Sequence, residues 1–324
     1  MQGWLIRCMD ILQSATHILK DCMGLKKGES VLIITDNGMS DSIPDSLFHA
    51  AINAGCDSLI IKMKSRSVDG EEPPAYVASA MLEFDVIIAP TSKSLSHTQA
   101  RLNASKRGCR IATLPGITEY IMTSGGITAD YNEISRSAQK IKNLLKSVKT
   151  IRIVSDRGTD ILFNVNSEKW QADTGICRDK GCFTNLPGGE IFLAPDNANG
   201  IYFIDGSIGD LGLLDSPIKV QVNNREAVSI EGQNTGPLIA MLDKIGKKGR
   251  NIAELGIGLN QNASLLGNVL EDEKVKGTAH IAFGDNSTFG GDVKAGIHID
   301  GIMRDVTIFA DGRRLDLMNF EIQN

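Results

Sequence analysis

The hydrophobic positions of residues 1–148 alternate between a helical and an extended period. Apolar residues at helical spacing predict helices at 6–23 and 43–54, each followed directly by a glycine. Val31-Leu32-Ile33-Ile34-Thr35 lies between them and is a β-branched run typical of a fully buried strand. Further strands are expected at 58–62, 86–89 and 110–113. Strands that alternate with helices predict an α/β domain with a doubly wound parallel sheet, Rossmann-like or flavodoxin-like.

The pattern changes near residue 149, after a helix predicted at 130–148. Residues 151–154 and 160–165 are expected to form a hairpin across the turn Asp156-Arg157-Gly158-Thr159. Short extended runs follow, punctuated by glycine, with one helix among them. These runs are at 201–204, 218–222 and 228–230, and the helix is at 237–245. We therefore expect two domains, an α/β domain over 1–148 and a β-rich α+β domain over 149–324.

Composition limits the classes of function. The 324 residues are 42% hydrophobic and 23% charged, with a formal net charge of −5, which is typical of a folded globular protein. An acidic balance argues against nucleic acid and anionic membranes as partners. No apolar run reaches the ~20 residues of a membrane helix, and the N-terminus has no signal-peptide core, so a cytoplasmic location is expected. The six cysteines are expected to be buried thiols, Cys177 and Cys182 included.

Two histidines stand in patterns that suggest chemistry. His298 and Asp300 are two positions apart in an extended run, so an imidazole and a carboxylate share one face of a strand. His280 begins a similar run. A buried ion pair is the alternative to a metal half-site at His298 and Asp300. For the other three histidines, we expect capping, buried or solvent-exposed roles.

Two carboxylates lie in apolar, glycine-rich surroundings, where an unpaired charge is costly. Glu254 begins Glu254-Leu255-Gly256-Ile257-Gly258, and Glu190 follows Leu186-Pro187-Gly188-Gly189. Neither segment contains an arginine or lysine nearby, so a metal centre would account for both. The predicted metal ligands are Glu190, Glu254, His280, His298 and Asp300. Two divalent ions can be held by this set, and a single ion on the two histidines and Asp300 is the rival arrangement.

Four segments in fixed order carry a resemblance to a known family. They are Asn185-Leu186-Pro187-x-x-Glu190, Glu254-Leu255-Gly256-Ile257-Gly258, His280-Ile281-Ala282-x-Gly284 and His298-x-Asp300. In order and context they resemble the thermophilic-type leucyl aminopeptidases (aminopeptidase T and S). The resemblance implies a homodimeric metalloaminopeptidase that removes N-terminal residues from peptides with two divalent ions, Zn²⁺, Co²⁺ or Mn²⁺. It makes the five residues metal ligands, with Glu254 or Glu190 also taking the proton of the attacking water.

The family also has a glutamate shortly before its first ligand histidine. Glu273 is the counterpart at an offset spacing, whereas Glu271-Asp272-Glu273-Lys274 can equally be a solvated charged turn. Arg304 is expected either to bind a substrate carboxylate or to form a surface ion pair.

Because the sequence departs from the peptidase pattern in two ways, a second class of enzyme stays possible. The stretch after His280 contains no tyrosine, and only 17 residues separate His280 from His298. The same scaffold resembles 2,5-dihydroxypyridine dioxygenase, a mononuclear Fe²⁺ ring-cleaving enzyme that would need only His280, His298 and Asp300. The presence of Glu190 and Glu254 favours two metals and hydrolysis over one metal and oxygenation. A metal-binding protein without catalysis is a third interpretation.

Overall fold

The protein consists of two compact units in a computed structural model that describes residues 9–323. The N-terminal unit comprises Met1–Asn132, Asp173–Gly188 and Gln261–Ser264, and the C-terminal unit comprises Glu133–Ala172, Gly189–Asn260 and Leu265–Asn324. These units differ from the contiguous halves expected on either side of residue 149. The chain crosses between the units several times, which a boundary drawn from local composition does not reveal.

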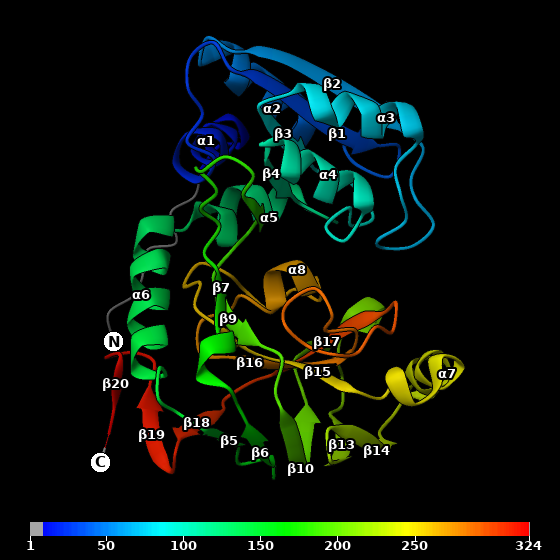
Figure 1. Ribbon diagram of the computed structural model, residues 1–324, viewed down its shortest axis with the longest axis vertical. Coiled ribbons are helices and arrows are strands. Elements are labelled where there is room, and N and C mark those ends of the chain that lie inside the picture. The colour runs from blue at the N-terminus through cyan, green and yellow to red at the C-terminus, as the bar shows by residue number, and fades with distance from the viewer. Residues whose placement is uncertain (1–8, 324) are drawn as a thin grey trace. The chain divides into compact units, whose positions relative to one another are not determined.

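The N-terminal unit contains a five-stranded sheet of order β2-β1-β3-β4-β8, in which every pair is parallel (Figure 1). This order is of the flavodoxin type. The strands are β1 (Ser30–Asp36), β2 (Asp57–Met63), β3 (Val86–Ala89), β4 (Arg110–Thr113) and β8 (Phe183–Asn185).

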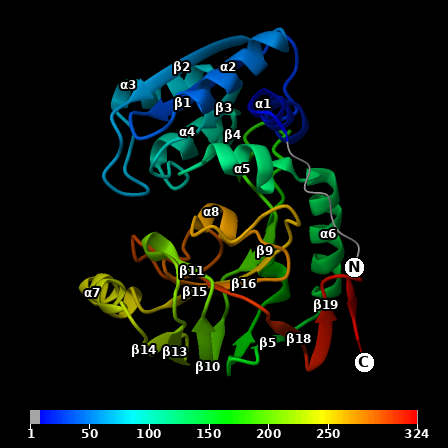
Figure 2. The ribbon, with the colours of Figure 1, turned by 180° about the vertical axis from the view of Figure 1, so that it is seen from behind.

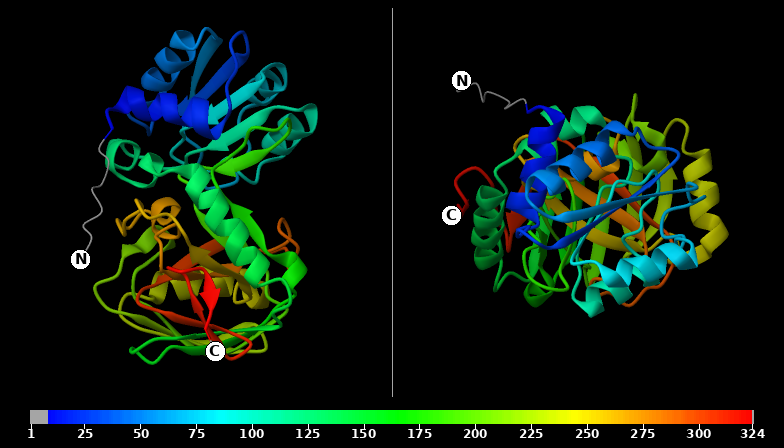
Figure 3. Two further views of the ribbon diagram at one scale, coloured as in Figure 1. Left: turned by 90° about the vertical axis from the view of Figure 1, so that its left-hand side faces the viewer. Right: turned by 90° about the horizontal axis from the view of Figure 1, so that it is seen from above.

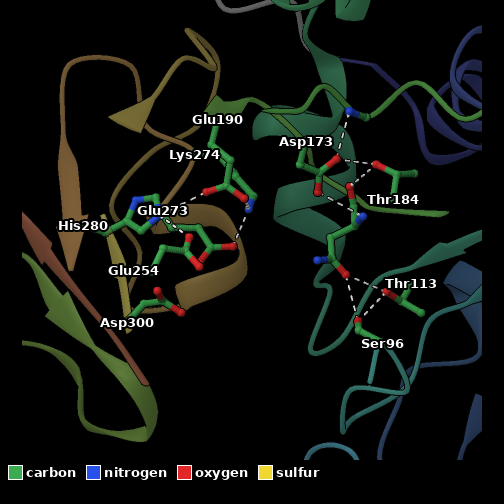
Figure 4. Close-up of polar contacts among 12 residues, drawn as sticks. Ser96, Thr113, Asp173, Thr184, Glu190, Glu254, Glu273, Lys274, His280 and Asp300 are labelled. Atoms are coloured by element: carbon green, nitrogen blue, oxygen red, sulfur yellow. Dashed lines mark hydrogen bonds and ion pairs between the residues drawn. The ribbon is translucent and has the colours of Figure 1, made fainter. Parts of the chain in front are cut away.

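The late strand β8 explains why residues 173–188 belong to the N-terminal unit. Besides its pairing with β4, Asn185 accepts hydrogen bonds through Oδ1 from Ser96 Oγ at 2.9 Å and Thr113 Oγ1 at 2.7 Å. Asp173 in turn accepts from the amide of Asn185 at 3.1 Å (Figure 4). A strand that joins a sheet from so far along the chain gives no local signal of the sheet it will join.

Helices cover the parallel sheet on both faces (Figure 3). Leu32, Ile34 and Ile111 pack with the apolar sides of α3 and α4, and the contacts of α2 with β1 and β2 cover the opposite side. The helices are α1 (Ile11–His17), α2 (Ser42–Asn53), α3 (Ala75–Ala80), α4 (Gln99–Arg107) and α5 (Glu119–Ser124). The helix predicted at 6–23 is α1, continued by a π-helical turn at Ile18–Cys22, and its first positions, 6–8, lie outside the described residues.

The expectation of free thiols at Cys177 and Cys182 is wrong. The two residues form a disulfide with a Cα–Cα distance of 5.4 Å, within the usual range. A turn of the chain brings the two side chains together, which cysteine count and spacing alone did not indicate. Cys22, Cys56 and Cys109 are free and buried as expected, and Cys8 lies outside the described residues.

The C-terminal unit contains two sheets. The eight-stranded sheet has the order β14-β13-β10-β6-β5-β18-β19-β20, and the seven-stranded sheet has the order β12-β11-β17-β16-β15-β9-β7. The strands of the first are β5 (Thr150–Val154), β6 (Asp160–Asn164), β10 (Asn197–Ile204), β13 (Ile218–Asn223), β14 (Glu226–Glu231), β18 (Thr307–Ala310), β19 (Arg313–Asp316) and β20 (Glu321–Ile322). Those of the second are β7 (Gln171–Asp173), β9 (Glu190–Leu193), β11 (Ser207–Ile208), β12 (Gly212–Leu213), β15 (Ile252–Gly258), β16 (Ala279–Gly284) and β17 (His298–Met303).

The two sheets share one hydrophobic core, to which the helices α6 (Tyr131–Leu144) and α7 (Gly236–Ile245) contribute (Figure 2). The Tyr202 ring of β10 lies 6.5 Å from the Phe283 ring of β16, centroid to centroid. The predicted hairpin is present as the antiparallel pair β5–β6, and the predicted runs near 201, 218 and 228 are β10, β13 and β14. The protein thus contains both the parallel sheet with helices and the β-rich part that the sequence predicts. None of the helices over residues 9–323 is long and apolar enough to span a membrane.

Candidate metal centre

Four neighbouring antiparallel strands, β17, β16, β15 and β9, carry all five predicted ligands. Asp300 pairs with Ala282, which pairs on its other side with Glu254. Side chains of paired residues share a face of the sheet, as do residues two apart on one strand. The register therefore places the whole set on one face. The residues of this face are Glu190, Glu254, His280, His298 and Asp300.

Small residues separate the ligands on this face. Gly256, Gly258, Ala282 and Gly284 alternate with them in the register. The intervening residues point to the opposite face and are fully buried in the core shared by the two sheets. They include Leu255, Ile257, Ile281 and Phe283. The glycine-rich apolar runs of the sequence are therefore strands with one face in the core and one face at the site.

The imidazole of His280 lies directly over Gly256, its partner on β15. A Cβ atom at Gly256 would lie 1.9 Å from Nε2 of His280, far inside any allowed contact. Only glycine at this position leaves room for the ring. The position of the His280 ring thus depends on the residue next to it in the sheet.

A segment after the short helix α8 (Val269–Asp272) brings two more charged residues to the cluster. A Cβ atom at Gly258 would lie 2.1 Å from the carbonyl oxygen of Val275, so this glycine allows the segment to approach the sheet. Glu273 is mostly buried, with its side chain 13% exposed, and Lys274 is completely buried. The alternative interpretation of 271–274 as a solvated charged turn is therefore wrong.

Lys274 was missed by the sequence analysis, which found no cation near either buried glutamate. Its Nζ lies 2.5 Å from Oε1 of Glu190 and also forms a short ion pair with Glu273 (Figure 4). Glu190 and Lys274 are 84 residues apart in the sequence. The buried glutamate therefore has a cationic partner that is distant in sequence. The mixture of charges at 271–274 gave no sign of burial.

The site residues form two groups, each compact enough to hold a metal ion. One contains Glu190, Glu273 and His280, and the other contains Glu254, His298 and Asp300, with the potential ligand atoms of each within 4.8 Å of one another. We call these the inner group and the outer group. Glu254 lies between them, since its Oε1 is 3.4 Å from Nε2 of His280 and its Oε2 is 3.5 Å from Nε2 of His298.

The two groups differ in access to solvent. The side chain of His298 is 25% exposed, whereas those of His280 and Lys274 are fully buried. Nδ1 of His298 lies 2.8 Å from the carbonyl oxygen of Asp285, to which it donates when its proton is on Nδ1. In that tautomer Nε2, which faces Asp300 and Glu254, carries no proton, and its lone pair is available to a metal ion. The outer group is therefore the one that a ligand from solution can reach.

An aromatic residue borders the outer group. The Phe289 ring packs edge-on against the His298 imidazole, with centroids 5.6 Å apart. It comes from the stretch after His280 in which the peptidase pattern has a tyrosine.

The pKa values show how strongly the cluster attracts cations. Burial raises the pKa of Glu273 to about 8, although Lys274 opposes the shift. Burial also acts to raise the pKa of Glu190, but Lys274 and His280 outweigh it, so this pKa is lowered. Burial acts to lower the pKa of His298, yet Asp300 and Glu254 raise it to about 10. Protonated imidazoles therefore stabilise the buried carboxylates in this structure, and a metal ion could supply the same positive charge.

The donor atoms fit a metal ion. Oδ1 of Asp300 is buried and accepts no hydrogen bond of ordinary geometry from the described residues. It lies 3.5 Å from Nε2 of His298, and Oε2 of Glu190 lies 3.1 Å from Nε2 of His280. Two ligand atoms at about 2.1 Å from one ion are roughly 3.0–3.4 Å apart. Both separations are close to those of neighbouring ligands on a metal.

Arg304 does not reach the site in this structure. Its side chain is 43% exposed, and its Nε lies 4.0 Å from Oδ1 of Asp205, which also accepts a hydrogen bond from the Arg304 amide at 2.8 Å. Strand β17 ends at Met303, so the alternation that places His298 and Asp300 on one face does not extend to Arg304. The surface ion pair is the interpretation that the structure supports.

Comparisons with known proteins place this geometry in a family. Among solved structures, 2,5-dihydroxypyridine dioxygenase from Pseudomonas putida is similar, with a TM-score of 0.79, 17% identity and 94% of each chain covered. Wild-type AmpT from Thermus thermophilus is similar with a TM-score of 0.70 and 15% identity, covering 94% of this chain and 96% of its own. At these identities both show a shared two-domain fold and nothing finer.

The search of curated protein sequences finds no match. A protein-family model does match: the model described as NicX, 2,5-dihydroxypyridine 5,6-dioxygenase, covers residues 10–316, nearly the whole chain. The resemblance to aminopeptidase T and S is thus supported at the level of fold, while the family model favours the alternative. The chain belongs to the 2,5-dihydroxypyridine 5,6-dioxygenase (NicX) family.

Proposed function

We propose that this protein is a mononuclear non-haem iron(II) dioxygenase that cleaves a dihydroxylated aromatic ring of the dihydroxypyridine type. The family model supports this class of reaction over the aminopeptidase first favoured by the sequence. The iron would be held by His280, His298 and Asp300, the two-histidine, one-carboxylate set of non-haem iron oxygenases. Both imidazoles present Nε2 to the carboxylate of Glu254, so the two histidines converge on one region.

The observation that carries the proposal is the buried ammonium of Lys274. The inner group, which would hold the second ion of a peptidase, already contains this cation 2.5 Å from Glu190. A divalent ion about 3 Å from the ammonium would be repelled by roughly 11 kcal/mol at an effective dielectric constant of ~20. The ammonium and a second metal ion would compete for the same carboxylates, which favours a single metal ion in this protein.

The side chains around the metal would have different roles. His298 is oriented by the carbonyl oxygen of Asp285, and the exposed edge of its group admits the ring substrate. Burial raises the pKa of Glu254, and Glu254 lies against both imidazoles, so its carboxylate can accept the proton of a ring hydroxyl at Oε2. Glu190 is bound to Lys274 and is not available for this step. When bound, iron(II) supplies the redox chemistry that joins molecular oxygen to the ring.

A two-metal aminopeptidase is the second candidate. The pairing of an inner and an outer group around Glu254 favours it, as does the fold shared with AmpT. It would require Zn²⁺, Co²⁺ or Mn²⁺ in both groups, with Glu254 or Glu190 as the proton acceptor. The homodimer implied by that resemblance stays a prediction, which size-exclusion chromatography with light scattering would test.

Metal content and oxygen uptake distinguish the two candidates. Protein loaded anaerobically with Fe²⁺ should bind one ion per chain and consume oxygen when 2,5-dihydroxypyridine is added, with loss of the ring absorbance. The same protein loaded with Zn²⁺, Co²⁺ or Mn²⁺ should not hydrolyse amino-acyl anilides. Two ions per chain together with anilide hydrolysis would reverse the assignment.

A further inference from the structure

Lys274 occupies a position that is built like a metal site. The side chain is fully buried, and its ammonium contacts Glu190 and Glu273, two of the three members of the inner group. The third member, His280, has Nε2 3.1 Å from Oε2 of Glu190. That oxygen is itself buried and accepts no hydrogen bond of ordinary geometry from the described residues. A cation in this group therefore meets two carboxylates and an imidazole.

We propose that the ammonium of Lys274 takes the second cation position of a two-cation site, so that a neutral side chain at position 274 converts a one-metal centre into a two-metal centre. The inference rests on the proposed function in one respect: it assumes that the wild-type protein binds one metal ion. The ligands of the added ion would be Glu190, Glu273 and His280. Carboxylates and imidazole together suit divalent ions such as Mn²⁺.

Glu254 would connect the two ions. Its two oxygens face different groups, Oε1 towards His280 at 3.4 Å and Oε2 towards His298 at 3.5 Å. A carboxylate in this position can bridge ions about 3.5–4 Å apart, the spacing of paired metal sites. With Lys274 in place, His280 serves the single metal. Without it, each group can hold its own ion.

Main-chain hydrogen bonds hold the segment that carries Glu273 and do not depend on the lysine side chain. The amide of Asn260 donates to the carbonyl oxygen of Lys274 at 2.7 Å, and the amide of Lys274 donates to the carbonyl oxygen of Glu271 at 3.0 Å. The missing side chain at Gly258 lets this segment lie on the sheet. Substitution of the lysine should therefore leave Glu273 beside Glu190, ready to bind an ion.

The test compares metal binding by the wild type with that of Lys274→Met and Lys274→Gln. Lys276→Met is the matched control, because Lys276 lies two residues away and its ammonium is over the Phe320 ring, 5.6 Å from its centroid. Each protein is titrated with Mn²⁺, the bound metal is measured by elemental analysis, and the loaded proteins are examined by electron paramagnetic resonance. Wild type and control should bind one ion and show the spectrum of an isolated Mn²⁺.

The two Lys274 variants should bind two ions per chain with spin coupling between them, and the second ion should raise their melting temperature. Two coupled ions in the wild type would overturn the proposal, as would one ion in a folded variant. Failure of both variants to fold even in excess Mn²⁺ would also count against it, because a metal ion that fits the position should replace the lost ammonium. Oxygen uptake by the iron-loaded wild type tests the proposed function separately, whatever the variants bind.

Discussion

The substitution Gly256→Ala tests the placement of His280 with a single methyl group. Gly256 lies inside strand β15, where alanine adopts the same backbone without strain. The added Cβ atom would lie 1.9 Å from Nε2, 2.2 Å from Cε1 and 2.6 Å from Cδ2 of the His280 ring. The clash thus falls on the imidazole, which is fully buried and has little room to move.

The size of the effect follows from these distances. The ring must move by about 1 Å or more for its contacts to reach 3 Å, and overpacking of this kind costs about 1–3 kcal/mol. We expect the melting temperature to fall by several degrees. Displacement of the ring also moves Nε2 away from Glu254 and the metal, so metal affinity should fall about tenfold to a hundredfold, as when a group that orients a ligand is lost.

Metal affinity is measured by competition with a chromogenic chelator, and stability by thermal unfolding of the metal-free protein. Gly236→Ala is the matched control, since Gly236 begins α7 and a Cβ atom there would meet nothing within 4 Å. This control should retain wild-type affinity and be equally or more stable, because alanine favours a helix over glycine.

Two results would refute the reasoning in different ways. A Gly256→Ala protein with wild-type melting temperature would show that the ring of His280 does not lie over the glycine. A destabilised protein with unchanged metal affinity would support the packing of the ring over Gly256 but would show that His280 is not a metal ligand.

Three further predictions concern the rest of the molecule. His298→Ala should abolish metal retention while the N-terminal unit stays folded, and a metal-replete, active His298→Ala protein would contradict the site. Asp285→Asn should lower the free energy of unfolding at pH 7, because the Asp285 carboxylate accepts hydrogen bonds from the amides of Ala295 and Gly296. Burial opposes the shift, but these and the Ser287 hydrogen bonds lower its pKa from 3.8. The contribution of the carboxylate to the free energy of unfolding is therefore complete above pH 3.8 and is lost as the pH falls through the lower pKa of the native state. The difference in free energy of unfolding between wild type and variant, measured by urea unfolding, should shrink towards about pH 3. A difference that stays constant with pH would argue against the carboxylate. Cys182→Ser should lower the free energy of unfolding of the oxidised protein by about 2 kcal/mol, the value for a loop this short, and addition of a reductant to the wild type should reproduce the loss.

The sequence by itself determined several strands and the shared face of His298 and Asp300. A strand alternates with a period of two, so His298 and Asp300 had to share a face, and the residues between them had to point away. Glu254 stood out for a similar reason, because a carboxylate among apolar and glycine residues needs a cation. The parallel strands β3 and β4 were predicted at their observed bounds, since buried β-branched runs bounded by turns are clear local signals.

Only the tertiary structure determined which cationic side chain forms an ion pair with which buried carboxylate. Lys274 reaches Glu190 across 84 residues, and its burial depends on a glycine of another strand, neither of which a local pattern records. The same holds for the return of β8 to the parallel sheet and for the Cys177–Cys182 disulfide. Periodicity fixes the direction of a side chain along one strand, whereas the approach of residues distant in sequence sets the charge balance of the candidate site.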